Sequence, residues 1–248
     1  MRAMILAAGL GTRLRPLTER IPKPLLPVGG VPLIVWNLLL LKQYGITEAM
    51  INLHYLGNLI QRELGDGEQW GMRISYSPEP ILLGTGGGLR AAEAFFQDED
   101  FLVMNSDTII ELNLDEVCKE HVSSQAVATL VLRDDPDVEQ WGVVESTHDR
   151  EILRINGQGK MDLGSQALVR KQMFAGVHLL HPSVLRHCEL GRRSHIIDAY
   201  VQELKAGSKI MGYVQSGYWS DVGTPERYAQ AQEDIETGCL SFRSRLVS

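Results

Sequence analysis

The 248-residue sequence has no long apolar run. Its longest, Pro32–Leu41, is interrupted by Asn37 and is about half of the roughly 20 residues that a membrane-spanning helix needs. Near the N-terminus, a Gly-rich turn stands where a secretory signal would need its cleavage site. We therefore expect neither a transmembrane helix nor export, and no membrane partner.

Cysteine is scarce, and the three residues Cys118, Cys188 and Cys239 form no CxxC pair. A disulfide framework and a thiolate zinc site both lack their usual spacing. The histidines show no HxH or HExxH pattern and no pairing with a nucleophilic Ser or Cys. These absences predict a protein of a reducing compartment, the cytoplasm, that works without a covalent catalyst.

An excess of positive charge is also missing, because the net charge is −7. This balance argues against a nucleic-acid partner. Residues 1–23 reverse the sign locally, with Glu19 as their one acid and the basic residues Arg2, Arg13, Arg15, Arg20 and Lys23. The local reversal predicts a small site for a polyanion.

Short apolar strands alternate with amphipathic helices along the first half of the chain. Strands are predicted at 3–8, 49–53, 73–77 and 101–107, with helices at 32–44, 56–64 and 88–96. Such a βαβ series predicts right-handed crossovers and a mostly parallel sheet. The second half is richer in strands, predicted at 126–132, 141–145, 152–155 and 174–180, with helices near 195–206 and 225–237. We predict one α/β domain over 1–237, Rossmann-like and doubly wound with a mostly parallel mixed sheet, and a loose tail at 238–248.

The first predicted strand ends in a loop of small residues, Ala7-Ala8-Gly9-Leu10-Gly11-Thr12-Arg13, where backbone N–H groups can approach a phosphate. A dinucleotide fingerprint would need glycine at position 14, which is Leu14, and a Walker loop would need Gly-Lys-Ser/Thr. Prolines at positions 16, 22, 24 and 27 block helix formation and predict an extended basic segment. Arg13 and Lys23 then bracket one anion site.

Two aspartates stand where metal ligands are expected. Asp107 ends the apolar strand in FLVMNSDT, and Asp221 lies in YWSDVGTPERY before a predicted helix. In-line phosphoryl and nucleotidyl transfer needs charge neutralisation on oxygens, usually by Mg²⁺ held by such carboxylates. Taken singly, each aspartate is more often a turn former or a helix cap. A metal-dependent glycosyltransferase is disfavoured, because residues 105–109 contain no DxD pattern.

The stretch LAAGLGTRLRPLTERIPKPLLPVGG resembles the signature of nucleoside-diphosphate-sugar pyrophosphorylases, the sugar-1-phosphate nucleotidylyltransferases. The resemblance implies a nucleotide-diphospho-sugar transferase fold and catalytic roles for Arg13, which steadies the leaving pyrophosphate, and Lys23, which bridges phosphates. It also implies that Asp107, in NSD, and Asp221, in WSDVGTP, bind the catalytic metal. The implied nucleotide-binding residues are Ala7, Ala8, Gly9, Gly11 and Thr12 in the first loop and Thr85 and Gly86 in EPILLGTGGG.

The sugar site follows from further similar segments. Trp141-Gly142-Val143-Val144-Glu145 resembles the aromatic-Gly-Val-Val strand of the family, and Phe174-Ala175-Gly176-Val177 resembles its sugar-facing segment. The implied sugar contacts are Asn105, Gly142, Glu145 and Gly176. The acidic-Lys-Pro element of the family is not clearly present, and only Lys160 lies nearby.

The resemblance covers about residues 1–230 and implies NTP + sugar 1-phosphate → NDP-sugar + pyrophosphate, with residues 1–110 as a nucleotide half and 111–237 as a sugar half. Among its members the sequence is similar to mannose- and heptose-1-phosphate guanylyltransferases and to N-acetylmuramate-1-phosphate uridylyltransferases. The GTGGG segment and the compact length resemble the guanylyltransferases, which favours GTP with a manno-configured sugar phosphate, but they also resemble the uridylyltransferases, which leaves UTP with N-acetylmuramate 1-phosphate as the alternative. A non-catalytic nucleotide-sugar sensor and a Rossmann oxidoreductase are the rivals from other classes. Such enzymes often associate, which leaves a homo-oligomer open.

Overall fold

The computed structural model describes residues 1–160 and 169–240. The chain divides into two compact units that interleave along the sequence. Unit 1 is built from Met1–Leu82, Met104–Leu112 and the C-terminal stretch from Gly217, and unit 2 from Leu83–Val103 and Asn113–Ser216. Among the described helices, none is both long enough and apolar enough to cross a membrane.

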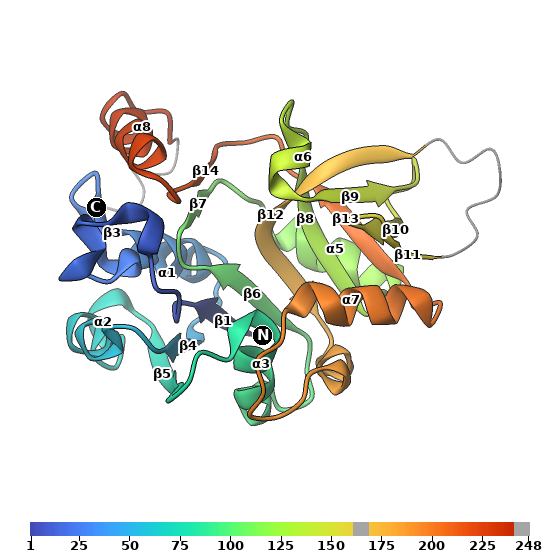
Figure 1. Ribbon diagram of the computed structural model, residues 1–248, viewed down its shortest axis with the longest axis horizontal. Coiled ribbons are helices and arrows are strands. Elements are labelled where there is room, and N and C mark those ends of the chain that lie inside the picture. Colours follow the sequence, from blue (N-terminus) through green and yellow to red (C-terminus); the bar gives the residue numbers. More distant parts are fainter. Residues whose placement is uncertain (161–168, 241–248) are drawn as a thin grey trace. The chain divides into compact units, whose positions relative to one another are not determined.

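Unit 1 is organised around three parallel strands, β1 (Arg2–Leu6), β4 (Glu48–Leu53) and β5 (Arg73–Pro78). Helix α1 (Leu33–Gln43) connects β1 to β4, and α2 (Gly57–Leu64) connects β4 to β5 (Figure 1). The strand interiors are mostly apolar and buried, which is typical of parallel sheets. The predicted βαβ series is confirmed.

Two short antiparallel pairs and a helix complete unit 1. Strand β7 (Thr108–Ile110) pairs with β14 (Trp219–Asp221), and β2 (Pro27–Val28) pairs with β3 (Val31–Pro32). Helix α8 (Pro225–Glu236) packs on this part of the unit, and its Gln232 accepts a hydrogen bond from the N–H of Gly29. They share a buried core of Leu14, Leu26, Val28, Leu33, Trp36, Ile109, Val222, Ala231, Ile235 and Leu240. This core fixes the stretch after Gly217 against the N-terminal loops, while residues 241–248 of the predicted tail lie outside the described residues.

The proline-rich segment after the glycine loop differs from the extended chain predicted for it. It forms three 3₁₀ turns, η1 (Thr12–Leu14), η2 (Leu17–Glu19) and η3 (Lys23–Leu25). The prolines do exclude an α-helix, but proline fixes φ near −65°, a value that 3₁₀ turns also use. The consequence is a folded segment that carries Lys23 inward, where the residue is 9% exposed.

Unit 2 contains a mixed sheet in which β12 (Arg170–Leu180) is central. Strand β12 pairs antiparallel with β8 (Ala128–Arg133) and with β9 (Val143–Ser146). Beyond them, β13 (Ile210–Val214) pairs parallel with β8, and β10 (Ile152–Ile155) pairs antiparallel with β9 and with β11 (Gln158–Gly159). The strand-rich second half that the sequence predicts is confirmed, and its strands supply the antiparallel part of the mixed sheet. Strand β6 (Phe101–Asn105) has its first residues in unit 2 and its last in unit 1.

The helices of unit 2 show where periodicity was insufficient. The unit contains α3 (Gly84–Ala91), α4 (Glu93–Phe96), α5 (Leu114–Ser124), α6 (Val138–Trp141), the 3₁₀ helix η5 (Pro182–His187) and α7 (Ile196–Lys205). Sequence patterns did not predict α5, because only three of its eleven residues are buried and its apolar stripe is correspondingly weak. Two boundaries were wrong: Trp141 ends α6 instead of starting a strand, and α3 begins at Gly84, not at Gly88.

Candidate active site

Asp107 and Asp221 are brought together by the β7–β14 pair in unit 1. Asp221 is the register partner of Thr108, the residue after Asp107. In addition, the N–H of Val222 donates to the carbonyl oxygen of Asp107 over 3.0 Å. Two carboxylates that are 114 positions apart in the sequence therefore flank one short ladder, as the metal-ligand prediction requires.

Three cationic side chains surround this carboxylate pair. Lys23 donates from Nζ to Asp107, and Arg227 of α8 donates from Nη1 to Oδ1 of Asp221 over 3.1 Å. Arg13 approaches Asp221 as well, because its Nη2 lies 3.1 Å from the position that a Cβ atom on Gly223 would occupy beside the carboxylate. The structure thus joins all four residues predicted for catalysis and metal binding in unit 1.

The pKa of Asp221 reports this crowding. Burial raises the pKa of its carboxyl, and the nearby Asp107 carboxylate raises it further. Lys23, Arg227 and Arg13 act in the opposite direction and favour the charged form, yet the pKa stays above its usual range. Burial and the second carboxylate together therefore outweigh the effect of the three cations on this pKa.

These oxygens fit a divalent cation. Mg²⁺ prefers oxygen ligands and is commonly held by one or two carboxylates, with substrate phosphates and water as its other ligands. No group of three or more His, Cys, Asp or Glu side chains suited to a metal occurs in residues 1–160 and 169–240. Asp107 and Asp221 thus provide the two-carboxylate arrangement that suits a metal shared with a phosphate substrate.

The glycine loop that follows β1 is held by a side-chain hydrogen bond from Thr18. Gly11 adopts a left-handed conformation with φ of 62°, and its carbonyl oxygen accepts from Oγ1 of Thr18 over 2.7 Å. A Cβ atom on Gly11 would stand 3.1 Å from Thr18 and 3.2 Å from Lys23, which leaves little space for a side chain. Gly9 is different, because no atom lies within 4 Å of its added Cβ. The fold thus requires glycine at position 11, while at position 9 the space outside the backbone is open.

A buried amide supports the start of the same loop. Asn52, at the end of β4, accepts a hydrogen bond from the N–H of Ala7 over 2.7 Å and donates to Oε1 of Glu79 over 2.7 Å. Asn52 and Glu79 are 3% and 4% exposed. Sequence reasoning missed both residues, although a polar Asn inside the apolar segment INLHYL was the available signal.

Other functional neighbours were also missed. Gly223 has no room for a side chain, because a Cβ atom there would collide with Oδ1 of Asp221. Arg227 was not singled out either, although it lies in the same WSDVGTPER segment.

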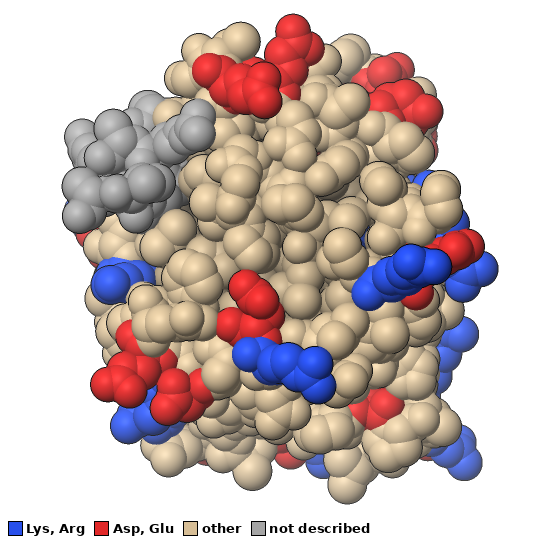
Figure 2. Space-filling model, turned by 90° about the vertical axis from the view of Figure 1, so that its left-hand side faces the viewer, with Lys and Arg blue, Asp and Glu red and all other residues tan. Residues whose placement is uncertain are grey.

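On the face drawn in Figure 2, acidic and basic side chains are scattered among uncharged ones, without a continuous basic stripe.

Unit 2 holds the remaining predicted nucleotide contacts. Thr85 and Gly86 lie in the first turn of α3, where a loop had been predicted. The hydroxyl oxygen of Thr85 accepts from the N–H of Ile196, and the N–H of Gly86 donates to the carbonyl oxygen of Ser194. Both residues are therefore engaged by a second segment of unit 2.

The predicted sugar contacts lie on three strands and a turn. Gly142 has φ of 92° after α6, and Gly176 has φ of 80° at a register shift in β12. Glu145 on β9 has a buried Oε2 without a hydrogen-bond partner and lies 3.8 Å from Nη1 of Arg154. Lys160 forms an ion pair with Glu151. The positive φ angles explain why positions 142 and 176 are glycine. Asn105 lies in unit 1, where its carbonyl oxygen accepts from Asn37. The sugar-binding roles of all four residues stay predictions.

Comparison with known proteins assigns the class. The model of the family described as "Nucleotidyl transferase" matches residues 2–238. The chain belongs to this nucleotidyl transferase family and is therefore an enzyme of the transferase class. The family assignment excludes the oxidoreductase alternative.

Individual proteins of this family and solved structures are similar to this chain along most of its length. The N-acetylmuramate α-1-phosphate uridylyltransferase of Neisseria meningitidis serogroup B is 36% identical over 94% of this chain and 97% of the relative. The mannose-1-phosphate guanylyltransferase of Mycobacterium tuberculosis is 30% identical over 95% of this chain and 65% of the relative. A crystal structure of a putative glucose-1-phosphate thymidylyltransferase from Bacillus anthracis superposes with a TM-score of 0.79 at 26% identity, over 94% of each chain. The relatives are sugar-1-phosphate nucleotidylyltransferases, and the predicted fold type is confirmed.

Proposed function

We propose that this chain joins a nucleoside monophosphate to a sugar 1-phosphate by nucleotidyl transfer, with Mg²⁺, in the cytoplasm. The observation that carries the proposal is the cluster of Arg13, Lys23, Asp107 and Asp221 in unit 1, beside a glycine loop with open space at Gly9. Such a cluster suits a triphosphate, because cations, a metal and backbone N–H groups can together neutralise phosphate oxygens. The three free cysteines support the reducing location.

In the proposed reaction, an oxygen of the sugar phosphate attacks the α-phosphorus of the nucleoside triphosphate. The bond from this phosphorus to the α,β-bridging oxygen breaks, and pyrophosphate leaves with the electron pair. Negative charge grows on the leaving group, where Arg13 and Lys23 would stabilise it electrostatically. No proton need be taken from a neutral nucleophile, because the attacking phosphate oxygen is already ionised.

Asp107 and Asp221 would hold Mg²⁺, which when bound supplies charge neutralisation for the phosphate oxygens. Burial and, after it, the nearby Asp107 carboxylate raise the pKa of Asp221, and a cation held by these two residues would favour the charged form. Arg227 would keep Asp221 oriented from α8. Residues 1–110 are proposed to supply the nucleotide contacts and, through Asn105, one sugar contact, while 111–237 supply the other sugar contacts. No nucleic-acid or membrane partner is proposed.

Two substrate pairs are supported. We place UTP with N-acetylmuramate 1-phosphate first, because the uridylyltransferase from Neisseria meningitidis aligns along nearly its whole length at 36% identity. GTP with mannose 1-phosphate or a heptose 1-phosphate is the second candidate. It is supported by the sequence of the GTGGG segment and by the guanylyltransferase of M. tuberculosis. A further relative, the D-glycero-α-D-manno-heptose 1-phosphate guanylyltransferase of Aneurinibacillus thermoaerophilus, is 26% identical over 95% of this chain and 99% of the relative.

The test is pyrophosphate release with UTP, GTP, CTP, ATP and dTTP, each crossed with N-acetylmuramate, mannose, heptose and glucose 1-phosphates. We expect release that needs one triphosphate and one sugar phosphate, and that stops with EDTA and returns with excess Mg²⁺. Triphosphate binding without release in any combination would instead support a nucleotide-sugar sensor. Release with the mannose or heptose phosphate and GTP alone would reverse our order of substrates.

A further inference from the structure

The first turn of α3 is held by a second segment, residues 192–195, which we call the clamp. The carbonyl oxygen of Ser194 accepts from the N–H groups of Gly86 over 3.0 Å and Gly87 over 3.4 Å. The N–H of Ser194 donates to the carbonyl oxygen of Leu83 over 2.9 Å. The clamp thus binds the backbone immediately before α3 and within its first turn. The N–H groups of Gly86 and Gly87 in this turn therefore already have an acceptor.

The helix after the clamp is tied to the same turn. The N-cap residue of α7, His195, makes no side-chain capping bond. Oγ1 of Thr85 instead accepts from the N–H of Ile196, the first residue of α7, over 2.9 Å. One of the four N–H groups that a helix start leaves without an internal partner is therefore satisfied from α3. Thr85 caps a helix 111 residues further along the chain.

The glycines of the GTGGG segment make this contact close. A Cβ atom on Gly84 would stand 2.6 Å from the carbonyl oxygen of Ser194, and one on Gly86 would stand 2.8 Å from Oγ of Ser194 and 2.9 Å from Sγ of Cys188. A Cβ atom on Gly87 would collide with the carbonyl oxygen of Arg192. The close packing against the clamp therefore explains why these positions are glycine.

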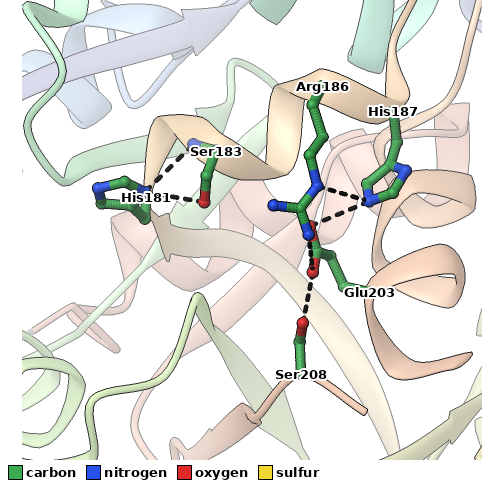
Figure 3. Close-up of polar contacts among 6 residues, drawn as sticks. All are labelled: His181, Ser183, Arg186, His187, Glu203 and Ser208. Carbon is green, nitrogen blue, oxygen red and sulfur yellow. Dashed lines mark hydrogen bonds and ion pairs between the residues drawn. The ribbon is translucent and has the colours of Figure 1, made fainter. Parts of the chain in front are cut away.

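Helix α7 is also anchored near its other end. Glu203 is completely buried, and its carboxylate accepts from Arg186 over 2.9 Å, contacts Nε2 of His187 at 3.0 Å and accepts from Ser208 (Figure 3). A buried carboxylate with several partners resists displacement, because losing one partner leaves charge uncompensated. The C-terminal half of α7 is therefore anchored to η5, while its first residue is held by Thr85 of α3.

We propose that the clamp and the Thr85–Ile196 hydrogen bond are a positioning device that sets the affinity of the enzyme for its nucleoside triphosphate. The inference rests on the proposed function, in which Thr85 and Gly86 belong to the nucleotide-binding loop. The device acts by fixing the first turn of α3, and it needs no contact between residues 192–196 and the substrate. Thr85 and Ile196 are thus positioning residues for triphosphate binding.

The first test changes the acceptor. Thr85→Val keeps the shape of the side chain and removes the oxygen, while Thr85→Ser keeps the oxygen. We expect Thr85→Val to raise the KM for the triphosphate about five- to tenfold, the size of one hydrogen bond. The KM for the sugar phosphate should stay within about twofold, and Thr85→Ser should restore the wild-type values.

The second test changes the donor, from a residue that is not assigned to ligand binding. Ile196→Pro removes the N–H at the first helical position, where proline is well accepted and where the extended backbone of His195 suits it. Its ring would also press on Thr85, so the triphosphate KM should rise at least as much as in Thr85→Val. Ile196→Ala is the matched control, because it loses a comparable part of the buried side chain but keeps the N–H. Its triphosphate KM should change less than about twofold.

The double variant Thr85→Ala/Ile196→Pro tests whether acceptor and donor act through one hydrogen bond. Alanine at position 85 removes the acceptor of that bond and makes room for the proline ring. It should be no worse than Ile196→Pro alone, since effects within one interaction do not add. Arg192→Ala is a control within the clamp, since its exposed side chain pairs only with Glu189 among the described contacts and its backbone is retained.

The inference is overturned if Ile196→Pro and Ile196→Ala have the same triphosphate KM, or if both substrates' KM values rise together. It is also overturned if Thr85→Val acts but Ile196→Pro does not, which would mark Thr85 as a direct ligand. Should the wild-type enzyme release no pyrophosphate, the proposed catalytic function fails on its own. The same variants then test the clamp through the Kd of the triphosphate, measured by equilibrium binding.

Discussion

Unit 1 and unit 2 hold their predicted ligand-binding residues by different means. In unit 1, charged side chains touch one another: Lys23 pairs with Asp107, and Arg227 pairs with Asp221. In unit 2, the nucleotide segment is held through backbone groups, as between Gly86 and Ser194. The difference teaches that side-chain chemistry is specified residue by residue, whereas a glycine segment depends on what packs against it.

The largest effect should come from the charge cluster of unit 1. Asp107→Ala or Lys23→Ala should lower kcat by roughly two to three orders of magnitude, the loss typical of one electrostatic group at a developing charge. Arg20→Ala, an exposed basic residue of the same segment, is the matched control and should retain kcat within about twofold. Pyrophosphate release at saturating substrates measures all three. Near-normal turnover in both site variants would remove the basis of the contrast.

In unit 2, the largest expected effect is on stability. Glu203→Ala leaves Arg186 and His187 without their shared buried carboxylate and should cost about 2–3 kcal/mol of unfolding free energy, somewhat below a fully buried pair because Arg186 is partly exposed. Glu189→Ala, which breaks the exposed pair with Arg192, should cost less than about 0.5 kcal/mol. Urea unfolding followed by circular dichroism compares them. Equal stabilities would mean that α7 is not anchored through Glu203.

Acid should weaken unit 2 through His178. Burial lowers the pKa of His178 to about 3, and its ring contacts the hydroxyl of Tyr200. Because the folded pKa lies below the unfolded value of about 6.5, the unfolded chain binds more protons as the pH falls from 6.5 toward 3. His178 should therefore cost about 2 kcal/mol of stability between pH 7 and pH 5.

The variant His178→Phe isolates that contribution, since it keeps a ring in the site but cannot titrate. Its unfolding free energy should fall less steeply than that of the wild type between pH 7 and pH 5, whatever the offset between the two curves. Parallel curves for the wild type and His178→Phe would show that His178 does not carry the acid sensitivity.

The smallest effect concerns the glycine loop of unit 1. Gly9→Ala meets no atom within 4 Å, so the melting temperature should change little. If a phosphate approaches this backbone as proposed, the added methyl group should raise the triphosphate KM about tenfold. Gly11→Ala is the contrasting variant, since its positive φ and its close neighbours should lower stability as well. A normal KM for Gly9→Ala would show that the loop does not need a bare backbone at position 9.

Sequence patterns predicted the regular elements of unit 1 well, because buried parallel strands and their helices leave strong apolar periodicity. They were weaker where periodicity is faint, as in α5, or where glycine obscures a helix start, as in α3. Arg13, Lys23, Asp107 and Asp221, which the structure brings together, could be singled out because their segments are long and chemically distinctive. Asn52 and Gly223 were missed, since their roles depend on neighbours distant in the sequence.

The sequence by itself determined the class of enzyme and the charged side chains predicted to bind phosphate, because a motif records which chemical groups a reaction needs. Tertiary structure alone decided that Asp107 and Asp221 share one short ladder, and that Thr85 caps α7. Those relations depend on strand register and on close packing between segments more than one hundred residues apart. Local propensity contains no information about such pairings, because their free energy arises only when the chain is folded.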